Sequence, residues 1–306
     1  MQLTTTVPTR RTVLGLGAGT ALTALVAVPG TARAATRPAR SVTGRLRALE
    51  AEYEARLGVF AFDTGTGRTL THRADERFPM CSVFKALAAG AVLRDLDTDG
   101  EFLAKRIRYT EKFVRDAGYA PVTGKPENVA KGMTVEQLCA ATVSESDNGA
   151  GNLLLRELGG PTAITRFCRS LGDGTTRLDR WEPELNSAEP WRETDTTSPA
   201  AVGRTFGRLV IGSALERPDR ELLRGWLVAN TTNDARFGAG LPADWVLADK
   251  TGGGSAYGIA NDVGVVWPPG RSPLVLAVLS TKYDPEGPTD DALVARAAEL
   301  VARTLT

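Results

Sequence analysis

The chain has 306 residues, of which 42% are hydrophobic and 24% are charged, and its formal net charge at pH 7 is +1. This is the composition of an ordinary globular protein, long enough to bury one large core or two cores that share an interface. No internal repeat, low-complexity tract or basic cluster is present, which excludes a repeat array and leaves no electrostatic footprint for nucleic acid.

The N-terminus has the pattern of a secretory signal. Arg10 and Arg11 precede an apolar run over 13–28, and a small-residue Ala-Arg-Ala pattern follows it. These features in this order predict a signal peptide over residues 1–34, and the arginine pair predicts the twin-arginine route. A membrane anchor is the alternative, but a run of about 16 apolar residues is short of the roughly 20 that a bilayer requires. We therefore expect an exported, secreted protein without a stable membrane anchor.

The first elements after this segment are a helix and a hairpin. Apolar residues at helical spacing predict an amphipathic helix over 41–56. An apolar run over 57–62 predicts a strand, and a Gly- and Thr-rich turn connects it to a second strand over 68–72.

Ser82 and Lys85 stand at the start of an Ala- and Leu-rich run that predicts a helix. Residues three apart share one face of a helix, so the hydroxyl and the amine lie together. Serine is a poor nucleophile at neutral pH, and a lysine desolvated by an apolar helix could act as its base. Ser-x-x-Lys occurs by chance about once in a chain of this length, so the pair requires support from other residues.

Beyond this pair the periodic segments are helical and strands are scarce. The predicted helices are 86–96, 134–143, 150–158, 161–171, 198–211 and 218–228. Ser198 followed by Pro199 is typical of a helix start, with serine as the cap and proline in the first turn.

Strands return in the last quarter of the chain. The predicted strands are 245–250, 258–267 and 273–281, and a closing helix is predicted over 289–305. Residues 35–75 and 229–306 are therefore expected to form one α/β layer, and 76–228 an inserted all-helical subdomain. We predict a single catalytic domain over 35–306 with its cleft where the two parts meet.

Ser146, Asp147 and Asn148 lie between two predicted helices and therefore on a loop. Ser146 could face a substrate there, and the amide of Asn148 could contact Lys85. The alternative is an ordinary loop, in which short polar residues are common.

Residues 177–197 lack clear periodicity and have about the length of a compact Ω-loop, the name used for them below. Arg180 and Asp195 carry opposite charges within it. Glu182, held next to Pro183, could position a water molecule. Solvated surface charges are the alternative explanation of this segment.

Lys250, Thr251, Gly252 and Gly253 end a predicted strand. Glycines allow a ligand to approach a strand edge closely, and Gly253 offers an N–H group without a side chain in the way. The lysine and the threonine hydroxyl would attract a carboxylate. A Gly-rich turn after an edge strand is the alternative.

The cysteine and histidine content excludes two hydrolase classes. His72 is the only histidine, in a polar, turn-like stretch, so neither a Ser-His-Asp triad nor a zinc site with several imidazoles is available. Cys81, Cys139 and Cys168 are odd in number and adjoin apolar runs, which favours buried thiols. Lysine and carboxylate groups must therefore carry the protons.

Three motifs in one order give the chain a resemblance to a known family. Their residues are Ser82-x-x-Lys85, Ser146-Asp147-Asn148 and Lys250-Thr251-Gly252. The set resembles the motifs of the serine β-lactamases and penicillin-binding proteins, and the segment Arg-Trp-Glu-Pro-Glu-Leu-Asn over 180–186 is similar to the loop of class A β-lactamases. The resemblance covers nearly the whole mature chain. It implies a β-lactamase/transpeptidase-like α+β fold, with a five-stranded antiparallel sheet flanked by helices from both chain ends.

The resemblance also implies an activity, hydrolysis of the β-lactam amide of penicillin-type antibiotics. Ser82 would open the ring to an acyl-enzyme, with the N–H groups of Ser82 and Gly253 as the oxyanion hole. Lys85, or Glu182 through a water, would take the serine proton. Glu182 and Asn186 would hold the water that releases the acyl group.

Further roles follow in the same way from the resemblance. Ser146, with Lys250 behind it, would return a proton to the leaving nitrogen. The other residues implied in substrate binding or in pinning the Ω-loop are Tyr119, Asn148, Thr251, Gly252, Arg180 and Asp195. The resemblance implies no cofactor and no metal, a small-molecule β-lactam as the partner, and a monomer.

Family members commonly bring an arginine to the substrate carboxylate from one of two positions. The position after Lys-Thr-Gly is Ala260 here, although the connection over 255–258 is one residue longer than usual. The position before the motif is Arg236, so we expect Arg236 to bind the carboxylate. A solvated surface arginine is the alternative.

Other positions depart from the family pattern. Gly149 stands where threonine is common. Cys139 matches half of a disulfide of some relatives, but Ala89 occupies the other half. The carbapenemase-type bridge from Cys81 is excluded because Gly254 stands opposite.

Two other functions share the three motifs. A D,D-peptidase would act on peptidoglycan stems and release β-lactams slowly, and such enzymes lack the loop that carries Glu182 and Asn186. A β-lactam sensor would be acylated and remain so, but it requires a partner or a membrane segment that the sequence does not show.

Overall fold

The structure is a computed structural model that describes residues 41–306. The predicted signal peptide, residues 1–34, lies outside the described residues. Within the described part of the chain, every helix is too short or too polar to cross a membrane.

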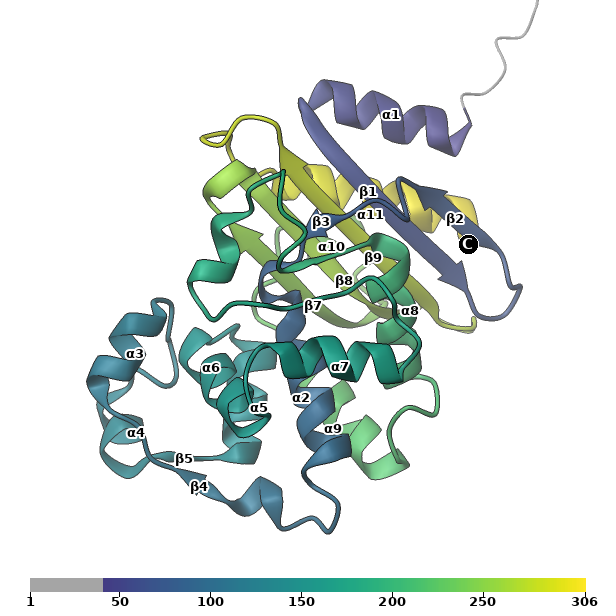
Figure 1. Ribbon diagram of the computed structural model, residues 1–306. Coiled ribbons are helices and arrows are strands. Elements are labelled where there is room, and N and C mark those ends of the chain that lie inside the picture. The colour runs from purple at the N-terminus through teal and green to yellow at the C-terminus, as the bar shows by residue number, and fades with distance from the viewer. Residues whose placement is uncertain (1–40) are drawn as a thin grey trace, which may run out of the picture. The chain divides into compact units, whose positions relative to one another are not determined.

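A five-stranded antiparallel sheet with the strand order β2-β1-β9-β8-β7 confirms the predicted fold class (Figure 1). Its strands are β1 (Ala55–Asp63), β2 (Thr69–His72), β7 (Val246–Gly254), β8 (Ile259–Trp267) and β9 (Leu274–Lys282). The central strands β8 and β9 are almost entirely buried on both faces. Their near-continuous apolar sequences are those of strands that are covered on both sides.

Helices from distant parts of the chain cover the two faces of the sheet (Figure 1). Helices α1 (Val42–Glu52) and α11 (Asp291–Leu305) pack on one face, and α8 (Pro199–Val210) packs on the other. Gly203 allows α8 to lie close to the sheet, because a Cβ atom there would stand 2.7 Å from the Phe60 ring. The insertion between the two sheet-forming segments therefore also supplies one layer of the sheet's covering.

Helix α2 (Phe84–Asp95) is the centre of the helical part, and it is buried on every side over residues 84–93. The helices in contact with it are α5 (Val135–Ser144), α6 (Asn148–Glu157), α7 (Thr162–Ser170) and α9 (Arg217–Val228). Alanines and Gly90 let these neighbours approach closely. Lys85, in the first turn of α2, is consequently removed from water.

The predicted long helices are confirmed, but several short elements were not predicted. The missed helices are α3 (Glu111–Ala117), α4 (Pro126–Lys131) and α10 (Phe237–Gly240), with 3₁₀ turns η1 (Cys81–Val83), η2 (Phe102–Ala104), η3 (Glu184–Ser187) and η4 (Ala256–Gly258). Two short ladders pair β3 (Phe78–Pro79) with β6 (Thr196–Thr197) and β4 (Arg106–Ile107) with β5 (Met133–Thr134). These two ladders lie within the predicted helical insertion and were not expected there, because two-residue strands are too short to leave a periodic pattern.

Two boundaries differ from the prediction by more than two residues. The first helix ends at Glu52 rather than at 56, because Glu54 adopts a positive φ of 47° that turns the chain into β1. Strand β7 does not end at Lys250 in a glycine turn. It continues to Gly254, and its glycines pair with residues 259–261 of β8.

Candidate active site

Ser82 and Lys85 meet at the junction of η1 and α2. Lys85 Nζ is fully buried and donates a hydrogen bond to Ser82 Oγ over 2.9 Å. Ser82 is half-buried and is the second residue of η1, where backbone N–H groups have no partner within the helix. The hydroxyl and an N–H group of Ser82 are therefore both available at one place.

Lys85 is surrounded by acceptors from three other segments. Its Nζ donates to the Ser146 carbonyl oxygen over 2.7 Å and to Asn148 Oδ1 over 2.6 Å, and it lies 3.1 Å from Glu182 Oε1. Burial lowers the pKa of Lys85, and the negative charge of Glu182 opposes that shift. A lysine in this position can exchange a proton with both Ser82 and Glu182.

The loop between α5 and α6 is shaped to present Ser146 and Asn148. Ser146 has a positive φ of 56°, and its hydroxyl lies 3.4 Å from Lys85 Nζ. Asn148 Nδ2 donates to the Ala117 carbonyl oxygen over 2.9 Å, which fixes the orientation of its amide. Asp147, the middle residue of the motif, is fully buried and caps α6 through the Ala150 N–H group. Asp147 thus holds the loop, while its two neighbours reach Lys85.

Gly149 stands in place of threonine because another threonine occupies the space. A Cβ atom on Gly149 would lie 2.4 Å from Thr123 Oγ1. That hydroxyl donates to Asp147 Oδ1 over 2.7 Å, so it is already part of the support of the loop.

The Ω-loop is pinned by Arg180 and Asp195. Arg180 Nε donates to Asp195 Oδ2 over 2.6 Å, and Asp195 Oδ1 accepts from the N–H groups of Asp179 and Arg180 over 2.7 and 3.0 Å. The carbonyl oxygen of Asp195 accepts from the Met80 N–H group over 2.9 Å, two residues before Ser82. The end of the loop is therefore fixed to the segment that carries Ser82.

Glu182 is buried in the Ω-loop with its carboxylate toward Ser82. Its Oε1 lies 3.4 Å from Ser82 Oγ, and its Oε2 accepts from Asn186 Nδ2 over 2.6 Å. Asn152 bonds both the N–H and the C=O group of Glu182, over 3.0 and 2.9 Å. Asn186 Oδ1 is buried and has no hydrogen-bond partner within residues 41–306, so it and Glu182 can bind a water molecule.

Lys250 is fully buried and lies on β7, the strand that packs against the 3₁₀ turn η1 that carries Ser82. Burial, with a smaller contribution from the charge of Lys85, lowers the pKa of Lys250 to about 7, although Asp262 and Asp249 favour its charged form. Its Nζ donates to the Thr251 carbonyl oxygen over 3.0 Å. The resemblance implied that Lys250 stands behind Ser146, and in the part of the chain that the structure describes Lys250 makes no hydrogen bond to Ser146.

The glycines of β7 bring this strand against η1. A Cβ atom on Gly252 would lie 2.8 Å from the Met80 carbonyl oxygen and 2.9 Å from Val83 Cγ2. A side chain at Gly252 would therefore push β7 away from Ser82. The next residue, Gly253, is exposed at the cleft, so its N–H group and that of Ser82 lie on facing elements.

Arg236 lies beside these glycines, held by three hydrogen bonds. Its Nη1 donates to the carbonyl oxygens of Gly252 and Asn261 over 2.8 and 2.7 Å, and its Nε donates to Asp291 Oδ1 over 2.7 Å. Its Nη2 would lie 3.2 Å from a Cβ atom on Gly253. Arg236 is therefore a cleft residue rather than a solvated surface arginine, and its Nη2 lies beside Gly253.

A single cleft of about 620 Å³ is lined by residues from all of these segments. Its lining includes Ser82, Tyr119, Ser146, Asn148, Asn186, Arg236, Thr251 and Gly253, all predicted from the sequence. Lys85, Glu182 and Lys250 are buried beneath its surface, whereas Tyr119 stands at the rim with 58% of its surface exposed. Thr232 also lines the cleft and bonds to the Thr251 hydroxyl, and it was not predicted. Neither Thr232 nor Asn152 belongs to a sequence motif, so only their contacts identify them.

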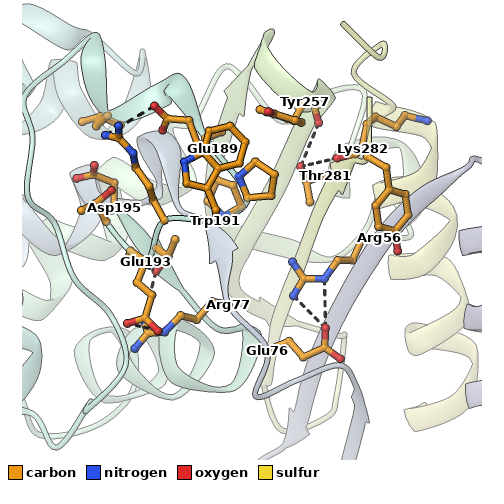
Figure 2. A pocket seen from close by; sticks show the side chains of 18 residues that line it. Arg56, Glu76, Arg77, Glu189, Trp191, Glu193, Asp195, Tyr257, Thr281 and Lys282 are labelled. Carbon is orange, nitrogen blue, oxygen red and sulfur yellow. Dashed lines mark hydrogen bonds and ion pairs between the residues drawn. The ribbon is translucent and has the colours of Figure 1, made fainter. Parts of the chain in front are cut away.

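A second cavity of about 520 Å³, the rear crevice, lies behind the Ω-loop (Figure 2). Trp191 and Glu189 stand on its loop side, and Tyr257, Thr281 and Lys282 on its sheet side. Leu185 lines this crevice and its neighbour Asn186 lines the cleft. The 3₁₀ turn of the loop is therefore a partition between two open spaces.

The histidine and the cysteines lie apart from this chemistry. His72 is buried at the end of β2, with Nε2 3.0 Å from Glu50 Oε2, and is not in a turn. The prediction of buried thiols is confirmed, because Cys81, Cys139 and Cys168 are all free and buried. Burial raises the pKa of each thiol.

Comparison with known proteins adds to this geometry. The family model described as "Beta-lactamase enzyme family" matches residues 41–305. The chain belongs to the β-lactamase enzyme family. A β-lactamase of Kitasatospora aureofaciens is 71% identical, and one of Streptomyces fradiae is 62% identical, each over 100% of both chains.

Solved structures of the β-lactamase family have the same fold. The β-lactamase from Streptomyces albus G superposes with a TM-score of 0.85 at 63% identity, covering 87% of this chain and 99% of that one. An ancestral class A β-lactamase matches with a TM-score of 0.80 at 49% identity, covering 86% and 100%. The motifs that suggested the family therefore lie in a fold that the family shares.

Proposed function

We propose that this chain hydrolyses the β-lactam amide of penicillin-type antibiotics as a class A serine β-lactamase. One observation carries the proposal. Ser82 Oγ lies 2.9 Å from Lys85 Nζ and 3.4 Å from Glu182 Oε1, at the floor of a cleft that opens to solvent. A nucleophile between a buried amine and a buried carboxylate has a base for each half of an acyl-transfer cycle.

In acylation, Ser82 Oγ attacks the β-lactam carbonyl carbon, and its proton passes to Lys85 or to Glu182. The new oxyanion is bound by the N–H groups of Ser82 and Gly253, and such donors contribute roughly 3 to 4 kcal/mol each in comparable enzymes. The amide C–N bond then breaks, and the leaving nitrogen takes a proton through Ser146. The product is an ester on Ser82.

In deacylation, a water held by Glu182 and Asn186 attacks the ester carbonyl. Glu182 takes the proton of the water, the bond between Ser82 Oγ and the acyl carbon breaks, and Ser82 regains its proton. The Asn186 amide donates to Glu182 over 2.6 Å and keeps its own unpaired Oδ1 for the water. The carboxylate and the amide oxygen thus form a water site built for this half-reaction.

The substrate carboxylate is bound on the opposite wall of the cleft. Arg236 Nη2 and the hydroxyls of Thr251 and Thr232 converge there, and Lys250 adds charge when it is protonated. Penicillins carry a carboxylate on the carbon next to the β-lactam nitrogen, so this group aligns the amide with Ser82.

Turnover of benzylpenicillin by the parent and by Glu182→Ala tests the proposal. The parent is expected to release many product molecules per enzyme, whereas the variant releases one equivalent and accumulates an acyl-enzyme visible by mass spectrometry. Glu184→Ala is the matched control, because Glu184 lies two residues later on the same Ω-loop, lines the cleft and has an exposed side chain. A parent that stops after one turnover would instead be a penicillin-binding peptidase or a sensor.

We also propose that the chain is exported through the twin-arginine route and acts as a secreted monomer. The Arg10-Arg11 pair, the apolar run and the Ala-Arg-Ala pattern support export. Replacement of both arginines by lysine should abolish activity in the culture medium of the parent organism. Light scattering on the secreted protein should give the mass of a single chain.

A further inference from the structure

Helix α8 carries two arginines that the proposed β-lactam chemistry does not use. Arg204 and Arg208 are four residues apart, so they lie one above the other on one face of α8. Both are exposed, and neither forms an ion pair with a carboxylate of residues 41–306. Like charges in this arrangement repel each other, so the helix face gains from a bound anion.

The two arginines stand between an apolar and a polar cavity. The apolar cavity, about 460 Å³, is lined by Phe60, Phe62, Ile211 and Val275, and we call it the α8 pocket. The polar cavity is smaller, about 120 Å³. Arg204 and Arg208 line both cavities, so cationic groups stand at the mouth of a space whose other lining residues, apart from Thr64 and Thr69, are apolar or glycine.

The contacts of the arginines hold them at this mouth. The Arg204 guanidinium lies 5.0 Å from the centre of the Phe60 ring, a cation–π distance, and Arg208 Nη1 donates to the Leu171 carbonyl oxygen at the end of α7. Neither interaction neutralises the charge. The lining of the α8 pocket contains two cations and no acid.

The charge of the rear crevice is different (Figure 2). Its Arg56 is paired with Glu76 over 2.9 Å, and its Arg77 lies 3.8 Å from Glu193. An anion entering there would compete with carboxylates that are already present. Arg204 and Arg208 share the smaller polar cavity with Asp75 and Asp173 but form an ion pair with neither, so an anion in the α8 pocket would not have to displace a paired carboxylate.

We propose that the α8 pocket binds a small amphiphilic anion, a medium-chain or aromatic carboxylate. Its apolar part would lie against Phe60, Phe62 and Val275, and its carboxylate would lie between Arg204 and Arg208. The cavity has the volume of an ordinary small-molecule site, and an apolar wall with a few placed polar groups is the usual composition of such sites. The site lies on α8 and the sheet and is independent of Ser82.

Calorimetric titration with three compounds of equal chain length tests the charge preference. The probes are octanoate, 1-octanol and octyltrimethylammonium, whose eight-carbon chains end in a carboxylate, a hydroxyl and a quaternary ammonium group. Octanoate is expected to bind at one site, about tenfold or more tightly than either of the others, because a charge-assisted hydrogen bond is lost with each of them. Equal binding of all three would overturn the anion site.

Two variants locate the binding. Arg204→Gln should weaken octanoate binding about tenfold and leave octanol binding unchanged, whereas Arg204→Lys, the charge-retaining control, should restore most of the affinity. Thr69→Trp places a bulky side chain at the pocket from an exposed position of β2 and should abolish binding of all three probes. If Thr69→Trp does not fold, the pair of Arg204 variants still decides the question.

The active-site cleft also attracts carboxylates, so the two sites must be told apart. Octanoate in the α8 pocket should not compete with benzylpenicillin for the parent enzyme. Competitive inhibition, or octanoate binding that survives in a folded Thr69→Trp variant, would place the ligand elsewhere and overturn the proposal.

Discussion

Asp195→Asn should slow deacylation far more than acylation. In the structure, Asp195 Oδ1 accepts two backbone N–H groups of the Ω-loop, and Oδ2 accepts Arg180 Nε over 2.6 Å. Asparagine keeps one acceptor oxygen, but its NH2 group then faces the N–H groups of the Arg180 guanidinium, and two donors cannot form a hydrogen bond with each other. The variant loses a hydrogen bond to a charged group, worth about 1.5 to 3 kcal/mol, and leaves a buried donor unpaired.

The loss falls on the part of the site that carries Glu182. Acylation has Lys85 as a second base for Ser82, and the contacts of Lys85 with Ser82 and with the loop before α6 do not involve Asp195. The Met80 contact to Asp195 is made by a backbone carbonyl that the substitution keeps. If the lost hydrogen bond is worth about 2 kcal/mol and half of that raises the barrier to deacylation by displacing Glu182, deacylation slows about fivefold, since each 1.4 kcal/mol of barrier is a factor of ten in rate. Stopped-flow acylation rates and the steady-state acyl fraction by mass spectrometry measure the two steps separately.

The matched control is Glu193→Gln on the same loop. Glu193 is exposed and its only ion pair in the described residues, with Arg77, is long at 3.8 Å, so its replacement should change neither rate. The reasoning is refuted if Asp195→Asn lowers both rates by the same factor, or if Glu193→Gln has the same effect.

Three further predictions concern the walls of the cleft. Burial lowers the pKa of Lys250 to about 7, so its positive charge is present below pH 7 and lost above it. The KM for benzylpenicillin should therefore rise about threefold to tenfold from about pH 6 to pH 8. Lys250→Met should remove that pH dependence in steady-state kinetics. Arg236→Ala should raise the same KM roughly ten- to a hundredfold through loss of a charge-assisted hydrogen bond, and an unchanged KM would contradict the role of its Nη2. Gly149→Thr should lower the free energy of unfolding by about 1 to 3 kcal/mol in urea titrations, because its Cβ would stand 2.4 Å from Thr123 Oγ1. Adding Thr123→Ala to that variant should recover part of the lost stability. If the effects of the two substitutions are fully additive, the clash is excluded.

Much of the fold follows from local sequence signals. The run 274–279 is apolar without interruption because β9 is covered on both faces, and Ser198-Pro199 begins α8 as the capping rule predicts. Short elements such as α3 and the β4–β5 ladder leave no periodic pattern, because contacts with distant residues decide them.

The site was predictable where motifs mark it and not elsewhere. Ser82 and Lys85 share a face because they are three residues apart, which sequence spacing alone establishes. Asn152 is as important to the position of Glu182, but nothing in the sequence joins two residues 30 positions apart. Sequence reasoning also expected a turn after Lys250, because it could not show that β8 offers partners to Gly252 and Gly253.

The groups proposed for acylation and for deacylation lie on different structural elements, which affects how substitutions can change the function of such an enzyme. The groups that form the covalent bond lie on η1, α2, β7 and the loop before α6, whereas the carboxylate proposed to break it lies on one surface loop between two open spaces. A few substitutions in that loop would turn a catalyst that destroys an antibiotic into a receptor that keeps it. With Glu182 removed, the same chain would serve in the laboratory as a covalent tag that a penicillin derivative labels once.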